Sequence, residues 1–412
     1  MKLGLIGYPL GHSWSPEIHR FFLDCSYELW PLKEEELDRF FAERDFDGIN
    51  VTIPYKKTVI RYLDEIDETA ERIGAVNTIV NRNGKLTGYN TDWSAFAAML
   101  ETNRFDTSGR AVILGSGGAS KAVQAALQRF GTAYDVASTS GSGTVTYDEM
   151  YQRQAEYSLL INCTPVGMYP EDDALPADPG KFSGLKAVAD VVANPLRTAL
   201  CFEAEQNGIP SAGGFEMLVR QALEADRLFT GRDMDEKLAD ACMNYLYRKR
   251  RSIVLTGMPT SGKSTAARMI AEITGRRLVE MDEVISDRLG TTIAECFAAR
   301  GEAYFRSLEA ELCRELKNGG KTVVSCGGGV IKNRENMRYL SENGIIVWLD
   351  RSPDLLFASS DRPLSSDRQA VMRLYRERRE LYERYSDIRV SNDGDIRQTV
   401  SGILKAAGEN RL

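Results

Sequence analysis

The chain has 412 residues and a formal net charge of −7, with 43% hydrophobic and 27% charged residues. This length predicts two or three domains, and the composition is typical of a globular protein. An acidic chain without a basic stripe or arm is not expected to bind nucleic acid. Two histidines in the whole chain argue against a histidine-built zinc site and against a Ser-His-Asp triad.

The cysteines indicate a reducing compartment. There are seven, scattered and without a C-x-x-C pair, which predicts buried, reduced thiols in a cytoplasmic protein. The N-terminus lacks the apolar core and cleavage site of a signal peptide. No run reaches the roughly 18 apolar residues of a membrane span, so we expect no membrane partner.

Short apolar runs alternate with helical patterns, which predicts βαβ units, parallel sheets and an α/β fold. Early strands are expected at 3–7, 27–32 and 48–53, and helices at 17–23 and 34–44. Three polar motifs, Asn50–Lys56, Gly74–Thr78 and Asn90–Asp92, follow strand-like stretches, whose ends face the ligand crevice in open sheets. Together they predict a pocket for a small polyhydroxy molecule; the alternative is that these residues serve only turns and caps.

A second unit is expected to begin near residue 93, with strands at 111–114, 134–138, 159–163 and 187–192. The first strand leads into Gly115-Ser116-Gly117-Gly118-Ala119-Ser120 and a helix at 121–130, a dinucleotide-binding pattern in variant spacing. The second ends in Ser138-Thr139-Ser140, without the acid that grips a ribose 2′-hydroxyl. This disfavours NAD and leaves hydroxyls facing a 2′-phosphate. The loops Thr164–Met168 and Asn194–Leu196 are expected to touch the nicotinamide, and helices at 216–229 and 233–247 close the unit.

A third unit follows a short charged linker, Tyr247–Arg251. A strand at 252–256, the loop Gly257–Ser264 and a helix at 263–273 form a G-x-x-x-x-G-K-S phosphate loop, in which Lys263 reaches phosphates and Ser264 holds Mg²⁺. Further strands are expected at 278–281, with Asp282 at its end, at 322–325, before the triple glycine 327–329, and at 345–349. Gly301–Arg306 opens a helix with Glu309 one turn on. A polar stretch at 359–368 suits a lid, and a basic helix at 373–384 carries Arg378.

At these residues the chain resembles two families joined end to end. Residues 1 to about 247 resemble shikimate dehydrogenase through Ser13-x-Ser15-Pro16, Asn50-Val51-Thr52-x-Pro54-x-Lys56, Gly74–Thr78, Asn90–Asp92, the GSGGAS loop, Asn162-x-Thr164-Pro165-x-Gly167-Met168, Asn194-Pro195 and Met217-Leu218-Val219-x-Gln221. Residues from about 252 resemble shikimate kinase through the phosphate loop, Asp282, Gly301-Glu302-x-x-Phe305-Arg306-x-x-Glu309, the triple glycine, Arg362-Pro363-Leu364 and Arg378.

The resemblance implies a substrate-binding domain at 1–92 (completed by helices from 214–247), a Rossmann-like NADP domain at 93–213, a linker at 248–251 and a P-loop kinase domain at 252–412. It implies reduction of 3-dehydroshikimate to shikimate with NADPH, followed by phosphorylation of the shikimate 3-hydroxyl with ATP and Mg²⁺. A monomer or homodimer is expected.

The resemblance also implies site residues. In the dehydrogenase Lys56 and Asp92 would be the catalytic dyad. Substrate contacts there would be Ser13, Ser15, Thr52, Asn77 and Gln221, and NADP contacts Gly115, Ser116, Gly117, Gly118, Ala119, Ser138, Thr139, Met168 and Gly214.

In the kinase, Lys263 and Arg362 would neutralise the phosphates and Asp282 would orient the attacking hydroxyl. Shikimate would contact Asp282, Arg306, Gly328, Gly329 and Arg378. The nucleotide would contact Gly257, Pro259, Thr260, Ser261, Gly262, Lys263, Ser264 and Thr265, with Ser264 on the metal.

The chain departs from the family patterns at several positions. Ala193 stands where a tyrosine is usual, Trp93 where a glycine follows the catalytic aspartate, and Glu280 where the kinase has an aspartate. Ser138–Ser140 replaces Asn-Arg-Thr and removes the arginine that clamps the 2′-phosphate. Two alternatives stay open: a dehydrogenase shifted to another substrate such as quinate, or a non-catalytic ligand-binding front half.

Overall fold

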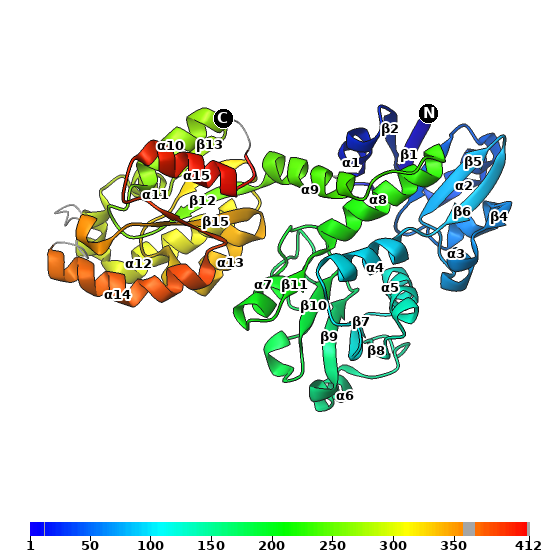
Figure 1. Cartoon of the computed structure of the whole chain (residues 1–412), viewed down its shortest axis with the longest axis horizontal. Helices are drawn as coiled ribbons and strands as arrows, with labels where there is room; N and C mark the ends of the chain where they lie inside the picture. The colour runs from blue at the N-terminus through cyan, green and yellow to red at the C-terminus, as the bar shows by residue number, and fades with distance from the viewer. Residues whose placement is uncertain (12, 357–366, 410–412) are drawn as a thin grey trace. The chain divides into compact units, whose positions relative to one another are not determined.

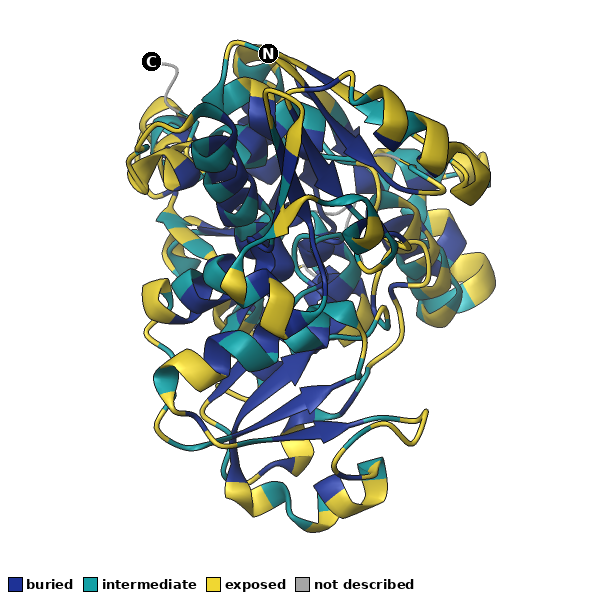
Figure 2. Ribbon diagram, turned by 90° about the vertical axis from the view of Figure 1, so that its right-hand side faces the viewer, coloured by how far each residue is buried: buried dark blue, intermediate teal, exposed yellow. Residues whose placement is uncertain are grey.

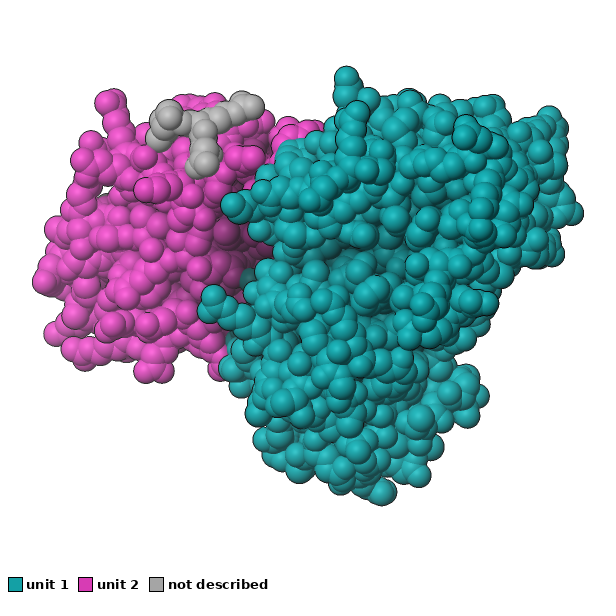
Figure 3. Space-filling view, turned by 45° about the vertical axis from the view of Figure 1, so that its right-hand side comes forward, with its two compact units in different colours: residues 1–243 teal, residues 244–412 magenta. Residues whose placement is uncertain are grey.

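The computed structural model describes the chain except for residues 12, 357–366 and 410–412. It contains two compact units, Met1–Met243 and Asn244–Leu412, which Figure 3 colours separately. Three sheets form the cores of an α/β fold, as predicted. Figure 2 shows buried strands beneath helices with exposed outer faces.

The first sheet opens unit 1 and has the order β2-β1-β3-β5-β6-β4. Its strands are β1 (Lys2–Ile6), β2 (Ser26–Trp30), β3 (Gly48–Val51), β4 (Glu65–Ile66), β5 (Thr78–Arg82) and β6 (Lys85–Tyr89). Its helical segments are α1 (Ser15–Phe22), η1 (Glu34–Glu36), α2 (Leu37–Glu43), η2 (Thr58–Tyr62) and α3 (Glu68–Ile73).

The prediction of parallel sheets is wrong for this one, because β5 runs antiparallel to both β3 and β6. Asn83 and Gly84 both have positive φ, at 53° and 85°. Asn-Gly favours the two-residue turn that joins antiparallel strands. The sequence therefore contains a hairpin signal at Asn83-Gly84.

The antiparallel strand also corrects the placement of one polar motif. Gly74–Val76 follows helix α3, whereas a strand was expected before it. Because β5 pairs antiparallel to β3, with Asn50 opposite Thr78, its first residues lie where β3 ends. The Gly74–Thr78 motif therefore lies at the expected edge of the sheet, but it leads into a strand instead of following one.

The second sheet of unit 1 is parallel, with the order β11-β10-β9-β7-β8. Its strands are β7 (Arg110–Leu114), β8 (Tyr134–Ala137), β9 (Tyr157–Asn162), β10 (Ala187–Asp190) and β11 (Ser211–Ala212). The accompanying helices are α4 (Asp92–Thr102), α5 (Gly118–Phe130), α6 (Tyr147–Gln152), η3 (Gln154–Glu156), η4 (Pro179–Lys181), α7 (Ala199–Gln206) and α8 (Gly214–Thr230).

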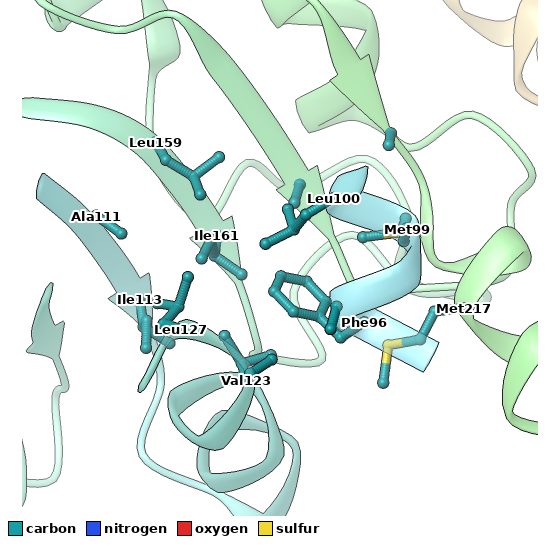
Figure 4. Close-up of a cluster of buried hydrophobic side chains, with 14 of the residues drawn as sticks. Phe96, Met99, Leu100, Ala111, Ile113, Val123, Leu127, Leu159, Ile161 and Met217 are labelled. Carbon is teal, nitrogen blue, oxygen red and sulfur yellow. The ribbon is translucent and has the colours of Figure 1, made fainter. Parts of the chain in front are cut away.

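Helix α4 connects the two sheets of unit 1 and packs against α5 and α8 (Figure 1). Phe96 on α4 is fully buried in a cluster with Val123 and Leu127 from α5 and Ile113 and Ile161 from the sheet (Figure 4). Since α4 begins at Asp92, this packing fixes the position of its first turn.

Unit 2 has a parallel sheet in the order β13-β14-β12-β15-β16. Its strands are β12 (Ser252–Thr256), β13 (Arg277–Glu280), β14 (Thr322–Ser325), β15 (Gly344–Asp350) and β16 (Ile388–Ser391). Its helices are α10 (Lys263–Thr274), α11 (Met281–Leu289), α12 (Ile293–Leu316), η5 (Val330–Lys332), α13 (Arg334–Glu342), η6 (Pro353–Leu355), α14 (Arg368–Tyr385) and α15 (Ile396–Ala406).

The residues expected as a linker are helical up to Arg250, as part of α9 (Lys237–Arg250). The helix expected to open at Gly301 is confirmed, because α12 breaks at Gly301, which has a φ of 81°, and its second part begins there. The domain boundaries given above stay a prediction.

The cysteines are all unpaired, and five of the seven are buried, as predicted. In the described part of the chain, none of the helices combines the length and the apolar character needed to cross a membrane.

Candidate active sites

Lys56 and Asp92 meet at the edge of the first sheet. Lys56 follows β3, and its Nζ donates to Asp92 Oδ2 at 2.6 Å. Asn77 Nδ2 donates to the other carboxylate oxygen of Asp92 at 2.9 Å and to Thr91 Oγ1 at 3.0 Å. Thr91 N donates back to Asn77 Oδ1 at 2.8 Å. Asn77 and Thr91 are each 2% exposed, so a buried amide and hydroxyl orient the carboxylate.

The other predicted substrate residues lie around this pair at different depths. Gln221 on α8 joins the network, because its Oε1 accepts from Thr91 Oγ1 at 3.5 Å. Ser15 N donates to Ser13 Oγ at 3.2 Å, and Ser15 is buried. Thr52 lies just after β3 and is half-buried. Among the described residues, no hydrogen bond joins Ser13, Ser15 or Thr52 to Lys56 or Asp92.

The predicted dinucleotide loop connects β7 to α5. Gly115 has a φ of 92°, and a Cβ there would lie 2.9 Å from Thr164 Cγ2. Gly115 therefore permits the close approach of the loop after β9. A Cβ at Gly117 or Gly118 would meet no atom within 4 Å, so the start of α5 is open. Backbone N–H groups at such a helix start bind phosphates.

Four serine hydroxyls gather beside this loop, and we call them the serine cluster: Ser116, Ser138, Ser140 and Ser142. Ser116 Oγ lies 3.0 Å from Ser138 Oγ and 2.7 Å from Ser142 Oγ. Ser140 Oγ lies 2.8 Å from Ser138 Oγ and 2.7 Å from Ser142 Oγ. The participation of Ser142 was not predicted, since no local pattern links it to the end of β7.

Asp190 is a buried acid beside the predicted nicotinamide loops, and the sequence patterns did not reveal it. It lies at the end of β10, is fully buried, and accepts from Asn162 Nδ2, Val192 N and Thr198 Oγ1 at 2.9, 3.0 and 2.7 Å. Burial raises its pKa to about 6, while these hydrogen bonds oppose the shift. Asp190 thus supports the loops that carry the exposed Met168 and the buried Gly214, where an added Cβ would lie 2.2 Å from Val191 O.

The phosphate loop of unit 2 has the predicted strand–loop–helix frame. Gly257 and Gly262 have φ of 145° and 96°. Lys263 is buried, and its Nζ donates to Gly257 O at 3.0 Å and Met258 O at 2.8 Å, across the loop. Ser264 Oγ donates to Glu280 Oε2 at 3.1 Å, so this glutamate reaches the hydroxyl predicted to hold Mg²⁺.

An arginine between two carboxylates lies beside the triple glycine. Arg306 donates to Glu302 Oε1 at 3.1 Å through Nε and to Glu309 Oε2 at 2.9 Å through Nη1. Burial raises the pKa of Glu309, and the contact with Arg306 opposes that rise. A Cβ at Gly329 would lie 2.4 Å from Arg306 Nη2, and one at Gly327 2.9 Å from Asp282 Oδ1. Asp282 is the second residue of α11 and not, as expected, the end of a strand.

Arg378 lies on the face of α14 that contacts the triple glycine. It is 2% exposed, and its Nη1 donates to Gly328 O at 2.7 Å. The alternative that Arg378 is part of a solvated helix face is therefore wrong. Tyr382, one turn later, donates to the same carbonyl at 2.7 Å and was not predicted. Arg362 and the stretch expected to form a lid lie outside the described residues, except for its last two positions.

Comparisons with known proteins agree with the candidate sites in both units. Residues 5–79 match the shikimate dehydrogenase substrate binding domain. A shikimate dehydrogenase (NADP(+)) of Halothermothrix orenii is 41% identical over 261 residues, 56% of this chain and 90% of the relative. The chain belongs to the shikimate dehydrogenase family. One from Clostridium beijerinckii is 36% identical over 57% of this chain and 94% of its own.

Solved structures of this family agree with the fold of the front part. The shikimate 5-dehydrogenase of Thermus thermophilus, in complex with NADP(H) and shikimate, has a TM-score of 0.55 at 32% identity, over 60% of this chain and 99% of its own. A chorismate mutase/shikimate 5-dehydrogenase fusion protein from Clostridium acetobutylicum has a TM-score of 0.55 at 34% identity, over 59% and 96%.

The remaining part has a second family match. Residues 259–407 match shikimate kinase. The chain is therefore an enzyme that joins a shikimate dehydrogenase to a shikimate kinase, two activities of the shikimate pathway.

Proposed function

We propose that unit 1 reduces 3-dehydroshikimate to shikimate with NADPH, and that unit 2 transfers a phosphoryl group from ATP to the 3-hydroxyl of shikimate. The observation that carries the first reaction is the 2.6 Å contact of Lys56 with Asp92. The second is supported by two arginines and Asp282 around the triple glycine, next to the phosphate loop.

In the dehydrogenase, side chains at the site donate the proton and stabilise the developing negative charge. Bound NADPH would supply the hydride. As negative charge grows on the carbonyl oxygen, the Lys56 ammonium stabilises it and donates a proton. Asp92 orients the ammonium, and Asn77 fixes Asp92 through the other carboxylate oxygen. Ser13, Ser15, Thr52 and Gln221 bind the carboxylate and hydroxyls of the substrate.

The residues present fit NADP(H). The open start of α5 accepts the pyrophosphate at Gly117, Gly118 and Ala119, and the serine cluster offers donors to the 2′-phosphate. Hydroxyls donate hydrogen bonds but carry no charge, and charge-assisted bonds are roughly twice as strong. NADPH is therefore preferred over NADH, with weaker discrimination than an arginine clamp gives.

In the kinase, positioning and charge neutralisation dominate, because phosphoryl transfer needs little covalent help. Lys263 and the loop amides bind the phosphates, and Ser264 holds Mg²⁺, with Glu280 within reach of the same hydroxyl. Arg306 and Arg378 bind the shikimate carboxylate as guanidinium groups do. Asp282 orients the attacking hydroxyl, and Arg362 neutralises the phosphates.

Assays of the purified full chain test the proposal. Lys56→Ala is expected to abolish 3-dehydroshikimate reduction and spare shikimate phosphorylation, and Lys263→Ala the reverse. Loss of both activities in either variant would contradict two separate sites. Quinate oxidation faster than shikimate oxidation would favour the shifted-substrate alternative, and a front half inactive on both would favour the non-catalytic one.

A further inference from the structure

Unit 1 contains a cavity of about 440 Å³ that the two reactions do not use, and we call it the α3–α5 pocket. Its volume lies in the range of small-molecule sites. It lies between α3, the first turn of α4, and α5. Its lining residues are Thr69, Arg72, Ile73, Trp93, Lys121, Gln124, Ala125, Gln128 and Arg129.

The lining has three cationic side chains and no carboxylate. Among the described residues, Arg72 Nη2 donates only a long 3.4 Å bond, to Thr69 Oγ1. Arg129 is 3.8 Å from Glu101, and both side chains are 54% exposed, so this ion pair is weak. In the part of the chain that the structure describes, the Lys121 ammonium has no ion pair or hydrogen bond. The uncompensated charge favours an anionic occupant.

The rest of the lining favours a flat occupant with a ring. Trp93 offers an indole, and the Arg129 guanidinium lies 6.0 Å from its ring centroid. An aromatic carboxylate can therefore stack on the indole while its charge meets the arginine. Gln124 and Gln128 both hydrogen-bond the Tyr134 hydroxyl, at 3.4 and 3.1 Å, which holds these amides at the wall.

The pocket borders both loops that build the dyad. Trp93 follows Asp92 directly in the first turn of α4. Ile73 ends α3, four residues before Asn77, and Lys121 Nζ reaches 3.9 Å from the position of a Cβ on Gly74. An occupant thus contacts the segments that place the Asp92 carboxylate and the amide that orients it.

We propose that the α3–α5 pocket is an effector site for a small planar organic carboxylate. The bound anion contacts the first turn of α4 and the end of α3, the segments that place Asp92 and Asn77, and so shifts the Asp92 carboxylate away from Lys56. Its binding lowers the kcat of the dehydrogenase. The kinetic part rests on the proposed dehydrogenase function, whereas the binding part does not.

Calorimetric titration of the full chain with benzoate tests binding. Saturable binding is expected, and Lys121→Gln, Arg129→Gln and Trp93→Ala should each weaken it roughly fivefold to tenfold, the effect of one lost contact. Lys237→Gln, an exposed lysine outside the pocket, is the matched control and should bind like the wild type. Acetate, which has the charge but no ring, should bind more weakly. Equal binding of benzoate to the wild type and the pocket variants, or of acetate and benzoate to the wild type, would overturn the site.

Dehydrogenase assays test the coupling. Saturating benzoate should lower kcat at least about twofold in the wild type, and Lys121→Gln should remove this effect while its kcat without benzoate is unchanged. Benzoate that binds without changing kcat would overturn the effector role. Failure of the proposed reaction would instead appear as absent activity without benzoate, with calorimetric binding intact.

Discussion

Lys56 Nζ and Asp92 Oδ2 lie 2.6 Å apart, although the two residues are 36 positions apart in the chain. Lys56→Ala removes the ammonium that donates the proton, so kcat for 3-dehydroshikimate reduction should fall by about 10²–10⁴-fold. The neighbouring exposed lysine provides a control, and Lys57→Ala should retain activity. Equal losses in the two variants would show that the ammonium of Lys56 is not catalytic.

Asn77 holds the Asp92 carboxylate and the backbone of Thr91 at the same time. Asn77→Ala leaves buried partners unsatisfied, so unfolding free energy should fall by about 1–3 kcal/mol and kcat should fall as well. Asn81→Ala is the matched control, because Asn81 Nδ2 donates to two backbone carbonyls, of Arg44 and Phe46. Denaturation and steady-state kinetics should show a stability loss in both variants and a kcat loss only in Asn77→Ala.

The serine cluster lacks a positive charge where the 2′-phosphate is expected. Thr139→Arg supplies one, and the ratio of kcat/KM for NADPH over NADH should rise about tenfold or more through a charge-assisted hydrogen bond. Thr102→Arg adds the same charge at the end of α4 and should leave the ratio unchanged. A wild-type enzyme that clearly prefers NADH would contradict the proposed cofactor.

Arg378 is the buried member of a run of arginines on α14. Arg378→Ala should raise the KM for shikimate strongly, because it removes a guanidinium expected to bind the carboxylate, and should leave the KM for ATP nearly unchanged. Arg379→Ala, on the exposed face of the same helix, should have little effect on either constant. Thermal melts of both variants separate a binding defect from unfolding.

Asp190 links stability to pH. Its pKa is about 6 in the folded chain, against an ordinary value of 3.8 for an aspartate. Folding therefore favours its protonated form, and this contribution is present below about pH 4 and lost as pH rises through about 6. Relative to Asp190→Asn, which cannot ionise, the wild type should lose about 2 kcal/mol of unfolding free energy between about pH 4 and pH 7. Asp24→Asn, an exposed position, should show no such trend.

Local patterns predicted most elements. The phosphate loop was recognised because its strand, glycines and helix adjoin in the chain, and β14 has the bounds expected from its apolar run. The antiparallel β5 was missed because the pairing direction depends on a turn, and the Asn83-Gly84 signal was not used. Arg378 was placed on the right helix, but its burial depends on contacts with Gly328, 50 positions away.

The residues that were not predicted are brought into place by contacts between residues far apart in the chain. Ser142 joins the serine cluster only because its loop folds back towards the end of β7. Asp190 matched no motif; the available signal was an acidic residue closing an otherwise apolar strand. Neither position was predictable without the pairing of β7, β9 and β10.

Glu302 and Glu309 already occupy the guanidinium of Arg306. An incoming carboxylate must exchange places with at least one of them, so acceptor binding at this arginine is a competition between anions. Glu309 is buried, whereas the Glu302 side chain is 39% exposed and can move into water. Glu302 is therefore the partner that leaves, and the measured affinity for the acceptor reports the difference between two ion pairs instead of the strength of one.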